Sequence, residues 1–293
     1  MANLELRKFG QDFEMKDFIG QGTFAKVFKC MERKTGECFA VKEFQTEGAN
    51  FDREVVKNEV EIWRTLQHRN IVSLYKRYYE NGGHIWVVLE FVNGKTILDE
   101  VVNKTVFTEE ETRGIMEQLI ESLKYLHRKR IVHRDIKADN ILLEKREGKP
   151  VVKLTDFGLA RRLPVDCDVI KCRAEGTPLY LAPETILADP IGPAVDIWAC
   201  GVILFLLLVG YPPFWHSDDR KLMLLIVEGC YSMPARYWDR VSDDAKDLVK
   251  RLLVVYPHKR VTAFKALNHP WISDFEENED KGIETYTRSL VSR

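Results

Sequence analysis

Apolar and polar residues alternate with a period of two along much of the first third of the chain, which predicts β-strands with two different faces. The alternation runs over residues 13–29 and is interrupted by Gly20-Gln21-Gly22, so it predicts a strand, a glycine-rich turn and a second strand. Three more apolar runs predict strands at 39–42, 71–79 and 85–92, with a turn at 81–83 between the last two. Residues 52–67 carry apolar side chains near helical spacing instead. We therefore expect a mostly antiparallel sheet with one helix.

Beyond Asn93-Gly94 the pattern becomes helical. Thr108-Glu109-Glu110-Glu111 has the form of a capping box, and an apolar stripe follows it at Ile115, Leu119, Leu123 and Leu126. The apolar run at 198–209 is well short of the roughly 20 residues that a membrane span needs, so it predicts a helix buried on all sides. We expect a first lobe over residues 1–92, a mainly helical second lobe over 93–273, and a flexible acidic tail over 274–293.

Composition and charge narrow the class of protein. The chain has 293 residues, 45% hydrophobic and 30% charged, which is typical of a soluble globular protein. Its formal net charge of −1 provides no global field for nucleic acid or an anionic membrane, and we interpret the basic run Arg128-Lys129-Arg130 as solvated surface. The first residues contain no apolar signal core, and Ala2 excludes a myristoylated glycine. We therefore expect a cytoplasmic protein, with the nucleus as the alternative, and no nucleic-acid or membrane partner.

The segment from His133 to Asn140 concentrates ionisable and metal-binding side chains. A buried structural loop would not gather so many such groups, because burying them is costly. We therefore predict that Asp135 orients a nucleophile and that Asn140 holds a metal. Asp156-Phe157-Gly158, which follows the predicted strand at 151–154, brings a second acidic residue with a glycine beside it.

Lys42, at the end of the predicted strand 39–42, is either an exposed edge lysine or a cation placed to neutralise phosphates. Glycines at positions 20 and 22 could let phosphate oxygens approach the backbone N–H groups, although such a motif alone favours a simple turn. Glu59 on the predicted helix is the expected buried partner of Lys42, since a buried carboxylate needs a counter-charge. Glu54 and Glu61 are the competing candidates.

The order of these motifs resembles the signature set of protein kinases. The resemblance rests on Gly20-x-Gly22-x-x-Ala25-x-Val27, Ala40-Val41-Lys42, Glu59, His133-Arg134-Asp135, Asn140, Asp156-Phe157-Gly158 and Ala182-Pro183-Glu184, and it covers about residues 13–272. It implies an α+β, bilobal protein kinase-like fold. The N-terminal lobe would bind nucleotide, and the C-terminal lobe would bind substrate and carry catalysis.

The resemblance also implies ATP and Mg²⁺ as cofactors and a protein as substrate. Asp135 would accept the substrate hydroxyl proton, and Lys42 would bind the α- and β-phosphates while paired with Glu59. Asn140 and Asp156 would hold the metal. The other implied positions are the adenine and phosphate contacts Ile19, Gly20, Gly22, Val27, Ala40 and Leu142, the hinge backbone of Glu90 and Val92 after the gatekeeper Leu89, and the structural braces Asp196 and Glu184–Arg260.

Two residues resemble those of serine/threonine kinases. Lys137 stands two residues past Asp135, and the hydroxyl of Thr177 would bridge to both. The motif Gly210-Tyr211-Pro212-Pro213-Phe214-Trp215 resembles the calcium/calmodulin-dependent group, although Ala138-Asp139 replaces that group's usual Pro-Glu. A pseudokinase that acts as a nucleotide- and partner-binding scaffold is the alternative, which the four intact catalytic positions disfavour.

Residues 159–176 contain no Ser, Thr or Tyr, so no phosphorylated side chain in this stretch can meet Arg134. We predict that an acidic residue substitutes for phosphate, Glu175 foremost, ahead of Asp166 and Asp168. The alternative is that Arg134 binds another group or stays solvated. If an acidic residue does substitute for phosphate, catalysis needs no phosphorylation of this loop.

The six cysteines form no C-x-x-C motif and have no histidine at zinc-ligand spacing, which predicts free thiols in a reducing compartment. Cys167 and Cys172 lie in the 159–176 stretch. We interpret both as spectator thiols, with a redox switch as the alternative.

Recognition of an arginine upstream of the target hydroxyl is expected to be weak. At the matching positions Thr96 replaces one acid and Lys95 adds a cation, while Asp99 keeps the second acid. Residues 274–293 lack a basic amphipathic helix of the type that binds calmodulin, so we expect any such segment to lie outside this chain or to be absent.

Overall fold

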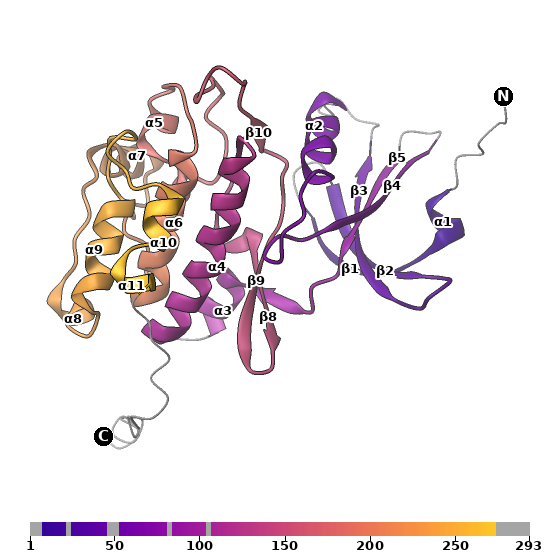
Figure 1. The fold of residues 1–293 in the computed structure, drawn as a ribbon, viewed down its shortest axis with the longest axis horizontal. Helices are drawn as coiled ribbons and strands as arrows, with labels where there is room; N and C mark the ends of the chain where they lie inside the picture. Colours follow the sequence, from indigo (N-terminus) through magenta and orange to yellow (C-terminus); the bar gives the residue numbers. More distant parts are fainter. Residues whose placement is uncertain (1–7, 22–24, 46–52, 81–83, 104–106, 274–293) are drawn as a thin grey trace.

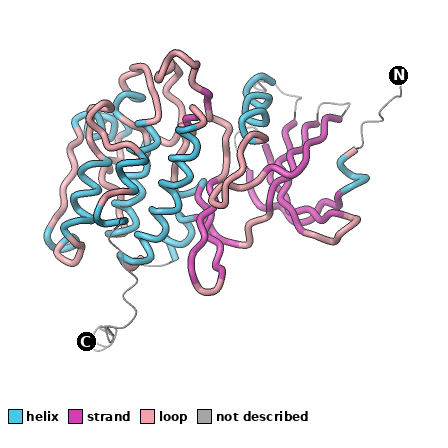
Figure 2. The backbone as a smooth tube through the Cα atoms, viewed as in Figure 1, coloured by secondary structure: helices cyan, strands magenta, loops and turns pink. Residues whose placement is uncertain are grey.

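The computed structural model describes residues 8–21, 25–45, 53–80, 84–103 and 107–273. Figure 1 shows a sheet-rich N-terminal lobe at one end of the molecule and a helical lobe at the other, and Figure 2 shows strands and helices divided in the same way. The expected α+β, bilobal architecture is therefore confirmed. Gly22, the turn at 81–83 and the tail at 274–293 lie outside the described residues.

The N-terminal lobe contains a five-stranded sheet in the order β1-β2-β3-β5-β4, and all of its pairings are antiparallel. Its strands are β1 (Phe13–Gln21), β2 (Ala25–Glu32), β3 (Cys38–Gln45), β4 (Leu74–Glu80) and β5 (His84–Glu90). The strand predicted at 71–79 begins later than expected, because Ile71 forms a parallel bridge with Leu154 instead of pairing with β5.

The helix of this lobe that reaches the site is α2 (Arg53–Trp63), which is shorter than the predicted 52–67. It ends where the N–H groups of Thr65 and Leu66 donate to carbonyls three residues back, both at 3.0 Å, which tightens the last turn. Its buried residues are Val56, Glu59, Val60, Ile62 and Trp63. Glu59 therefore points inward with the apolar stripe, as its position in the sequence predicted.

The two faces of the sheet have different neighbours. An aromatic-rich cluster that contains Phe13, Phe39 and Val41 covers one face, and α1 (Phe9–Asp12) closes it. There the ring of Phe9 stacks on Trp86 with 4.7 Å between the ring centroids. Because side chains alternate along a strand, Ala40 and Lys42 extend from the opposite face of β3. That face looks toward the second lobe.

The second lobe contains two small sheets and most of the helices. The sheets are β6 (Gly94–Thr96), β8 (Ile141–Arg146) and β9 (Lys149–Leu154) in the order β6-β8-β9, and β7 (Ile131–Val132) paired with β10 (Arg161–Arg162). The helices are α3 (Ile97–Asn103), α4 (Glu109–Arg128), α5 (Pro183–Ile186), α6 (Ala194–Val209), α7 (Asp219–Glu228), α8 (Ala235–Trp238), α9 (Asp243–Leu252), α10 (Ala263–Leu267) and α11 (Pro270–Ser273), with short 3₁₀ turns η1 (Ala138–Asn140) and η2 (Pro178–Tyr180).

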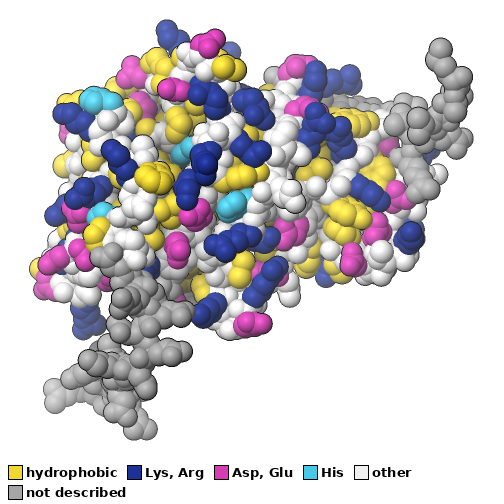
Figure 3. Space-filling model, viewed as in Figure 1, with side chains coloured by type: hydrophobic (Ala, Val, Ile, Leu, Met, Phe, Trp, Pro, Cys, Tyr) yellow, Lys and Arg dark blue, Asp and Glu magenta, His cyan; other side chains and the backbone are white. Residues whose placement is uncertain are grey.

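Two helical predictions for this lobe are confirmed. Thr108 caps α4 and forms the predicted capping box with Glu111. In α6 every residue from Val195 to Val209 is buried, so the long apolar run is a central core helix. Among the described residues no helix is both long and apolar enough to span a membrane. Figure 3 shows basic and acidic side chains interspersed over the surface in view, in keeping with the net charge of −1.

Candidate active site

Lys42 lies between two carboxylates that come from distant parts of the chain. Its Nζ is 2.7 Å from Oε1 of Glu59 on α2 and 3.0 Å from Oδ1 of Asp156 after β9. Glu59 is buried, and the competing candidate Glu61 pairs instead with Arg64 at 2.6 Å. The predicted Lys42–Glu59 pair is therefore present. Burial opposes the charge on Lys42, but the two carboxylates outweigh it and raise the pKa of this lysine, so it stays an ammonium at neutral pH.

Asp156 is held as an ionised carboxylate in a strained backbone conformation. Burial alone would raise its pKa, but the adjacent Lys42 ammonium outweighs burial and holds the pKa of Asp156 at about 2. Its φ of 63° lies in the left-handed region, which is uncommon for residues other than glycine and is concentrated at functional sites. The next residue, Phe157, is buried between the rings of Trp63 and His133, with centroids 5.1 and 4.8 Å away. This packing fixes the direction in which Asp156 points.

The segment from Asp135 to Asn140 forms a compact polar loop around one carboxylate. The Asn140 amide nitrogen donates to the backbone oxygen of Asp135 at 2.8 Å and to its Oδ2 at 2.9 Å. Lys137 Nζ contacts the same Oδ2 at 2.9 Å. The Asp135 carboxylate is thus oriented from two sides and compensated by a cation.

Asp196, at the start of α6, stabilises the backbone directly before this loop. Its carboxylate accepts the backbone N–H groups of His133 at 3.0 Å and Arg134 at 2.9 Å, and it contacts His127 Nε2 on α4 at 2.9 Å. Burial would raise the pKa of Asp196, but these contacts outweigh it and lower the pKa. Arg134 has a φ of 69°, so the brace holds a left-handed turn in place directly before Asp135.

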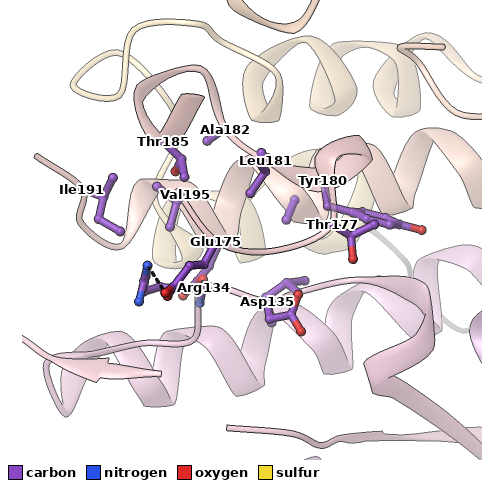
Figure 4. Close-up of a pocket in the computed structure, with 13 residues that line it drawn as sticks. Arg134, Asp135, Glu175, Thr177, Tyr180, Leu181, Ala182, Thr185, Ile191 and Val195 are labelled. Carbon is purple, nitrogen blue, oxygen red and sulfur yellow. Dashed lines mark hydrogen bonds and ion pairs between the residues drawn. The ribbon is translucent and has the colours of Figure 1, made fainter. Parts of the chain in front are cut away.

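Arg134 contacts the loop that precedes Thr177. Its guanidinium donates to the backbone oxygens of Leu159 at 3.1 Å and Arg173 at 3.0 Å, and it lies 3.6 Å from Oε2 of Glu175, as Figure 4 shows for the last pair. Asp168, an alternative candidate, instead pairs with Arg130 at 3.1 Å. Glu175 is thus the acidic residue that meets Arg134.

The catalytic candidates from both lobes line one cavity of about 490 Å³. Its lining residues include Lys42, Glu59, Asp135, Lys137, Asp156 and Thr177. Figure 4 shows Thr177 and Asp135 near one another. In the described part of the chain, however, the Thr177 hydroxyl makes no hydrogen bond to Asp135 or Lys137. The predicted bridge is therefore not formed among the described residues, while Lys137 Nζ contacts the Asp135 carboxylate at 2.9 Å.

Several of the predicted adenine and phosphate contacts lie on adjacent strands of the five-stranded sheet. Gly20 pairs with Val27, which pairs with Lys42, so one row crosses β1, β2 and β3. Ala40 pairs with Leu89 in the next row. Ile19 is half exposed, Leu142 on β8 is partly buried, and Val92 is buried after the end of β5. The register places Val27 opposite Lys42, and Ala40, two residues before Lys42 on β3, shares its face of the sheet.

Asn140 and Asp156 fit a magnesium–nucleotide complex. The Asn140 side-chain nitrogen is used by Asp135, which leaves the side-chain oxygen as a ligand, and Asp156 is ionised. Mg²⁺ is commonly bound through one or two protein oxygens together with substrate phosphates. Among the described residues no group of three His, Cys, Asp or Glu side chains offers another metal site.

The structural brace Glu184–Arg260 is also present. Arg260 is buried and donates to both oxygens of Glu184, at 2.7 and 3.0 Å. This bidentate pair joins the start of α5 to the segment before α10 and supports the loop that carries Thr177.

Two residues near the site were not identified from the sequence. The Trp63 indole N–H donates to the Val72 carbonyl at 2.7 Å, and Lys153 Nζ lies 2.5 Å from Glu90 Oε1. The sequence offered a weak signal for each. Trp63 was visible only as part of an apolar stripe, and Lys153 only as a lysine within the apolar strand 151–154.

Asp99, the remaining acid after the hinge, is used inside the protein. Its carboxylate accepts the N–H of Thr96 at 3.2 Å and the Thr96 hydroxyl at 2.8 Å, at the start of α3. A carboxylate that caps a helix is less available to an incoming cation. Of the two loop cysteines, Cys167 is exposed and Cys172 is partly buried.

Comparison with known proteins agrees with this geometry. The protein kinase domain family matches residues 13–272. The chain is 40% identical over 267 residues to the calcium/calmodulin-dependent protein kinase type II subunit delta of Oryctolagus cuniculus, which covers 91% of this chain and 50% of that protein. It is 39% identical over 270 residues to the calcium/calmodulin-dependent protein kinase type II alpha chain of Drosophila melanogaster, with 92% and 51% covered. The chain thus spans about half the length of these relatives.

Proposed function

The chain belongs to the protein kinase domain family, and from this premise we propose that it transfers the γ-phosphoryl group of ATP to serine and threonine hydroxyls of proteins. One observation carries the proposal. Lys42 is held between Glu59 and Asp156, at 2.7 and 3.0 Å, in the same cavity as Asp135. A phosphate-binding cation, a metal-binding carboxylate and a hydroxyl-orienting carboxylate are the groups that phosphoryl transfer requires.

Each of these residues has a distinct task. Lys42 presents a fixed ammonium to the phosphates, and Asn140 and Asp156 would hold Mg²⁺, which neutralises phosphate charge when bound with ATP. Asp135, oriented by Asn140, accepts the hydrogen bond of the substrate hydroxyl and then its proton. Lys137, 2.9 Å from Asp135, supplies positive charge where negative charge develops. Such a preorganised contact is typically worth about 3 kcal/mol of barrier.

Two features support serine and threonine as acceptors. Lys137 is in contact with Asp135, and Thr177 lines the same cavity. Both match the serine/threonine class of this family. The similarity to calcium/calmodulin-dependent relatives supports the same class.

The Arg134–Glu175 contact supports catalysis without phosphorylation of the 159–176 loop. A phosphate on such a loop acts by giving an arginine an anionic partner. Here Glu175 already supplies the anion, at 3.6 Å from the guanidinium. The two backbone carbonyls that Arg134 also contacts hold the loop in the same place.

Weak recognition of upstream arginine is the corresponding proposal for peptide choice. Lys95 is exposed, and the Asp99 carboxylate is engaged by Thr96. A positional peptide library that varies each residue around the acceptor tests this directly. The proposal requires that an arginine upstream gives no strong preference.

Phosphorylation of a generic basic protein by the purified chain with ATP and Mg²⁺ tests the function. The matched control is Asp135→Asn, which keeps the shape of the side chain and removes the proton acceptor. The assay contains neither calcium nor calmodulin, because it tests transfer by these residues alone. We expect transfer by the parent protein and a loss of about 100-fold in the variant. Nucleotide binding without any transfer by the parent would instead favour the scaffold alternative.

A further inference from the structure

Lys153 is a buried lysine to which none of the roles above applies. It lies on β9, and only 8% of its side chain is exposed. A buried ammonium is costly unless it is paired. Its Nζ lies 2.5 Å from Oε1 of Glu90, the last residue of β5 and the first of the expected hinge.

Glu90 is fixed by more than this ion pair. Its second carboxylate oxygen accepts the N–H of Ser73 at 3.1 Å, and its own N–H donates to the Ser73 carbonyl at 2.9 Å. These contacts define both the backbone and the side chain of Glu90. Lys153 provides the positive charge that compensates the Glu90 carboxylate where it is partly buried.

Among the described residues, Glu90 is the carboxylate that pairs with Lys153. Gln67, His68, Arg69, Ser73, Glu90 and Lys153 line a cleft behind the hinge, and Glu90 is the one carboxylate among these described residues. Arg69 adds a further positive charge to the same cleft. In the part of the chain that the structure describes, Lys153 forms its one ion pair with Glu90.

The strand that carries Lys153 also touches the rest of the nucleotide site. Lys153 pairs in register with Leu142, an expected adenine contact, and Leu154 exchanges backbone hydrogen bonds with Asn70 at 2.8 Å and Val72 at 2.9 Å. Asp156 follows two residues after Leu154. A displacement of β9 at Lys153 would thus first move the hinge, which Lys153 contacts through Glu90, and Leu142, with which it pairs.

We propose that Lys153 is a positioning residue for the adenine end of the nucleotide site. By holding the Glu90 carboxylate, it presets the hinge backbone from 90 to 92 for hydrogen bonding to the purine. The inference rests on the proposed function, since it assumes that adenine binds at this hinge. It assigns Lys153 no contact with ATP.

Binding of two fragments of ATP separates positioning of the adenine end from a general structural role. Adenosine probes the hinge end, and inorganic tripolyphosphate with Mg²⁺ probes the phosphate end. We expect Lys153→Met to weaken adenosine binding about tenfold, the usual size of a coupling between neighbouring sites, and to leave tripolyphosphate binding unchanged. KM for ATP should rise more than kcat falls. Lys153→Arg keeps the charge and should recover most of the adenosine affinity.

Three further proteins complete the test. Glu90→Gln should reproduce the effect of Lys153→Met, and the double variant should lose no more than either single variant. Lys124→Met is the matched control, because it breaks a partly exposed ion pair with Glu121 at 3.0 Å on α4 and should change neither affinity. If Lys153→Met fails to fold, the comparison of Glu90→Gln and Lys153→Arg carries the same test.

Equal weakening of adenosine and tripolyphosphate binding would show that Lys153 has only a structural role. Unchanged adenosine affinity in Lys153→Met and Glu90→Gln would also overturn the inference. A parent protein that binds tripolyphosphate but no adenosine would overturn it as well. Failure of the proposed function gives a different result, in which the parent binds both fragments and transfers no phosphate.

Discussion

The guanidinium of Arg134 lies 3.6 Å from the carboxylate of Glu175, and only 3% of the arginine side chain is exposed. The two residues belong to different loops. One loop carries Asp135, and the other leads into Thr177. Their contact therefore joins the segment that carries Asp135 to the segment that carries Thr177, and both of these residues line the same cavity.

Glu175→Gln should lower kinase activity about tenfold, the size expected when a charge-assisted contact to a buried partner is lost. The parent protein should keep its activity after phosphatase treatment. Activity against a protein substrate, measured before and after that treatment, checks both statements. Asp168→Asn is the control, because Asp168 is exposed and pairs with Arg130, and its activity should match the parent. A parent that loses its activity on phosphatase treatment would contradict the role given to Glu175.

Lys42→Met should fold and lose at least about 100-fold in phosphoryl transfer, because the ammonium that faces the phosphates is gone. The fold should persist because burial raises the pKa of Glu59, so this carboxyl can take up a proton once its partner is removed. Turnover and circular dichroism of the variant provide the measurement. Wild-type turnover in Lys42→Met would refute the assignment of the site.

Stability should fall as the pH drops below about 6.5, in part because of His133. Burial lowers the pKa of His133, so the unfolded chain binds a proton at this residue more readily than the folded chain does. A group of this kind costs stability as the pH falls from the unfolded value toward the folded one. Urea unfolding at pH 5 to 7 measures the slope, and His133→Phe keeps a ring beside Phe157 while removing the titration. A slope that is identical in both proteins would contradict this account.

Trp63→Phe should destabilise the protein by about 2 kcal/mol, because the buried Val72 carbonyl loses the indole N–H that lies 2.7 Å away. Activity should also fall, since Trp63 lies one helical turn after Glu59 and packs on Phe157. Denaturant unfolding and kcat/KM for ATP measure the two effects. Trp215→Phe, at an exposed tryptophan, should change neither quantity.

Local sequence pattern predicted the site well where a residue had only a few candidate partners nearby in the sequence. Glu59 follows the helical apolar stripe, so its inward direction and its pairing with Lys42 could be read from spacing. Arg134 and Glu175 could be matched because the intervening loop offered only three acids. The α4 capping box and the buried α6 were equally local, since each depends on residues within a single segment.

Contacts that depend on tertiary register could not be read in this way. Lys153 finds Glu90 only because β9 pairs with β8 and with residues 70–72, which no local pattern specifies. The same pairing takes Ile71 out of the predicted strand. The hydrogen bond expected from the Thr177 hydroxyl to Asp135 and Lys137 also depends on how two distant loops meet, and it is not formed among the described residues, where Lys137 contacts Asp135 at 2.9 Å.

The position of Phe9 determines where the chain can be shortened. Its ring covers Trp86 and lies 5.5 Å, centroid to centroid, from the ring of Phe13, and its N–H donates to Glu80 at 2.8 Å. A recombinant fragment that starts at Phe13 would keep every catalytic residue and lose this cover. The aromatic face left open would favour self-association. Fragments for crystallisation or screening should therefore begin before Lys8.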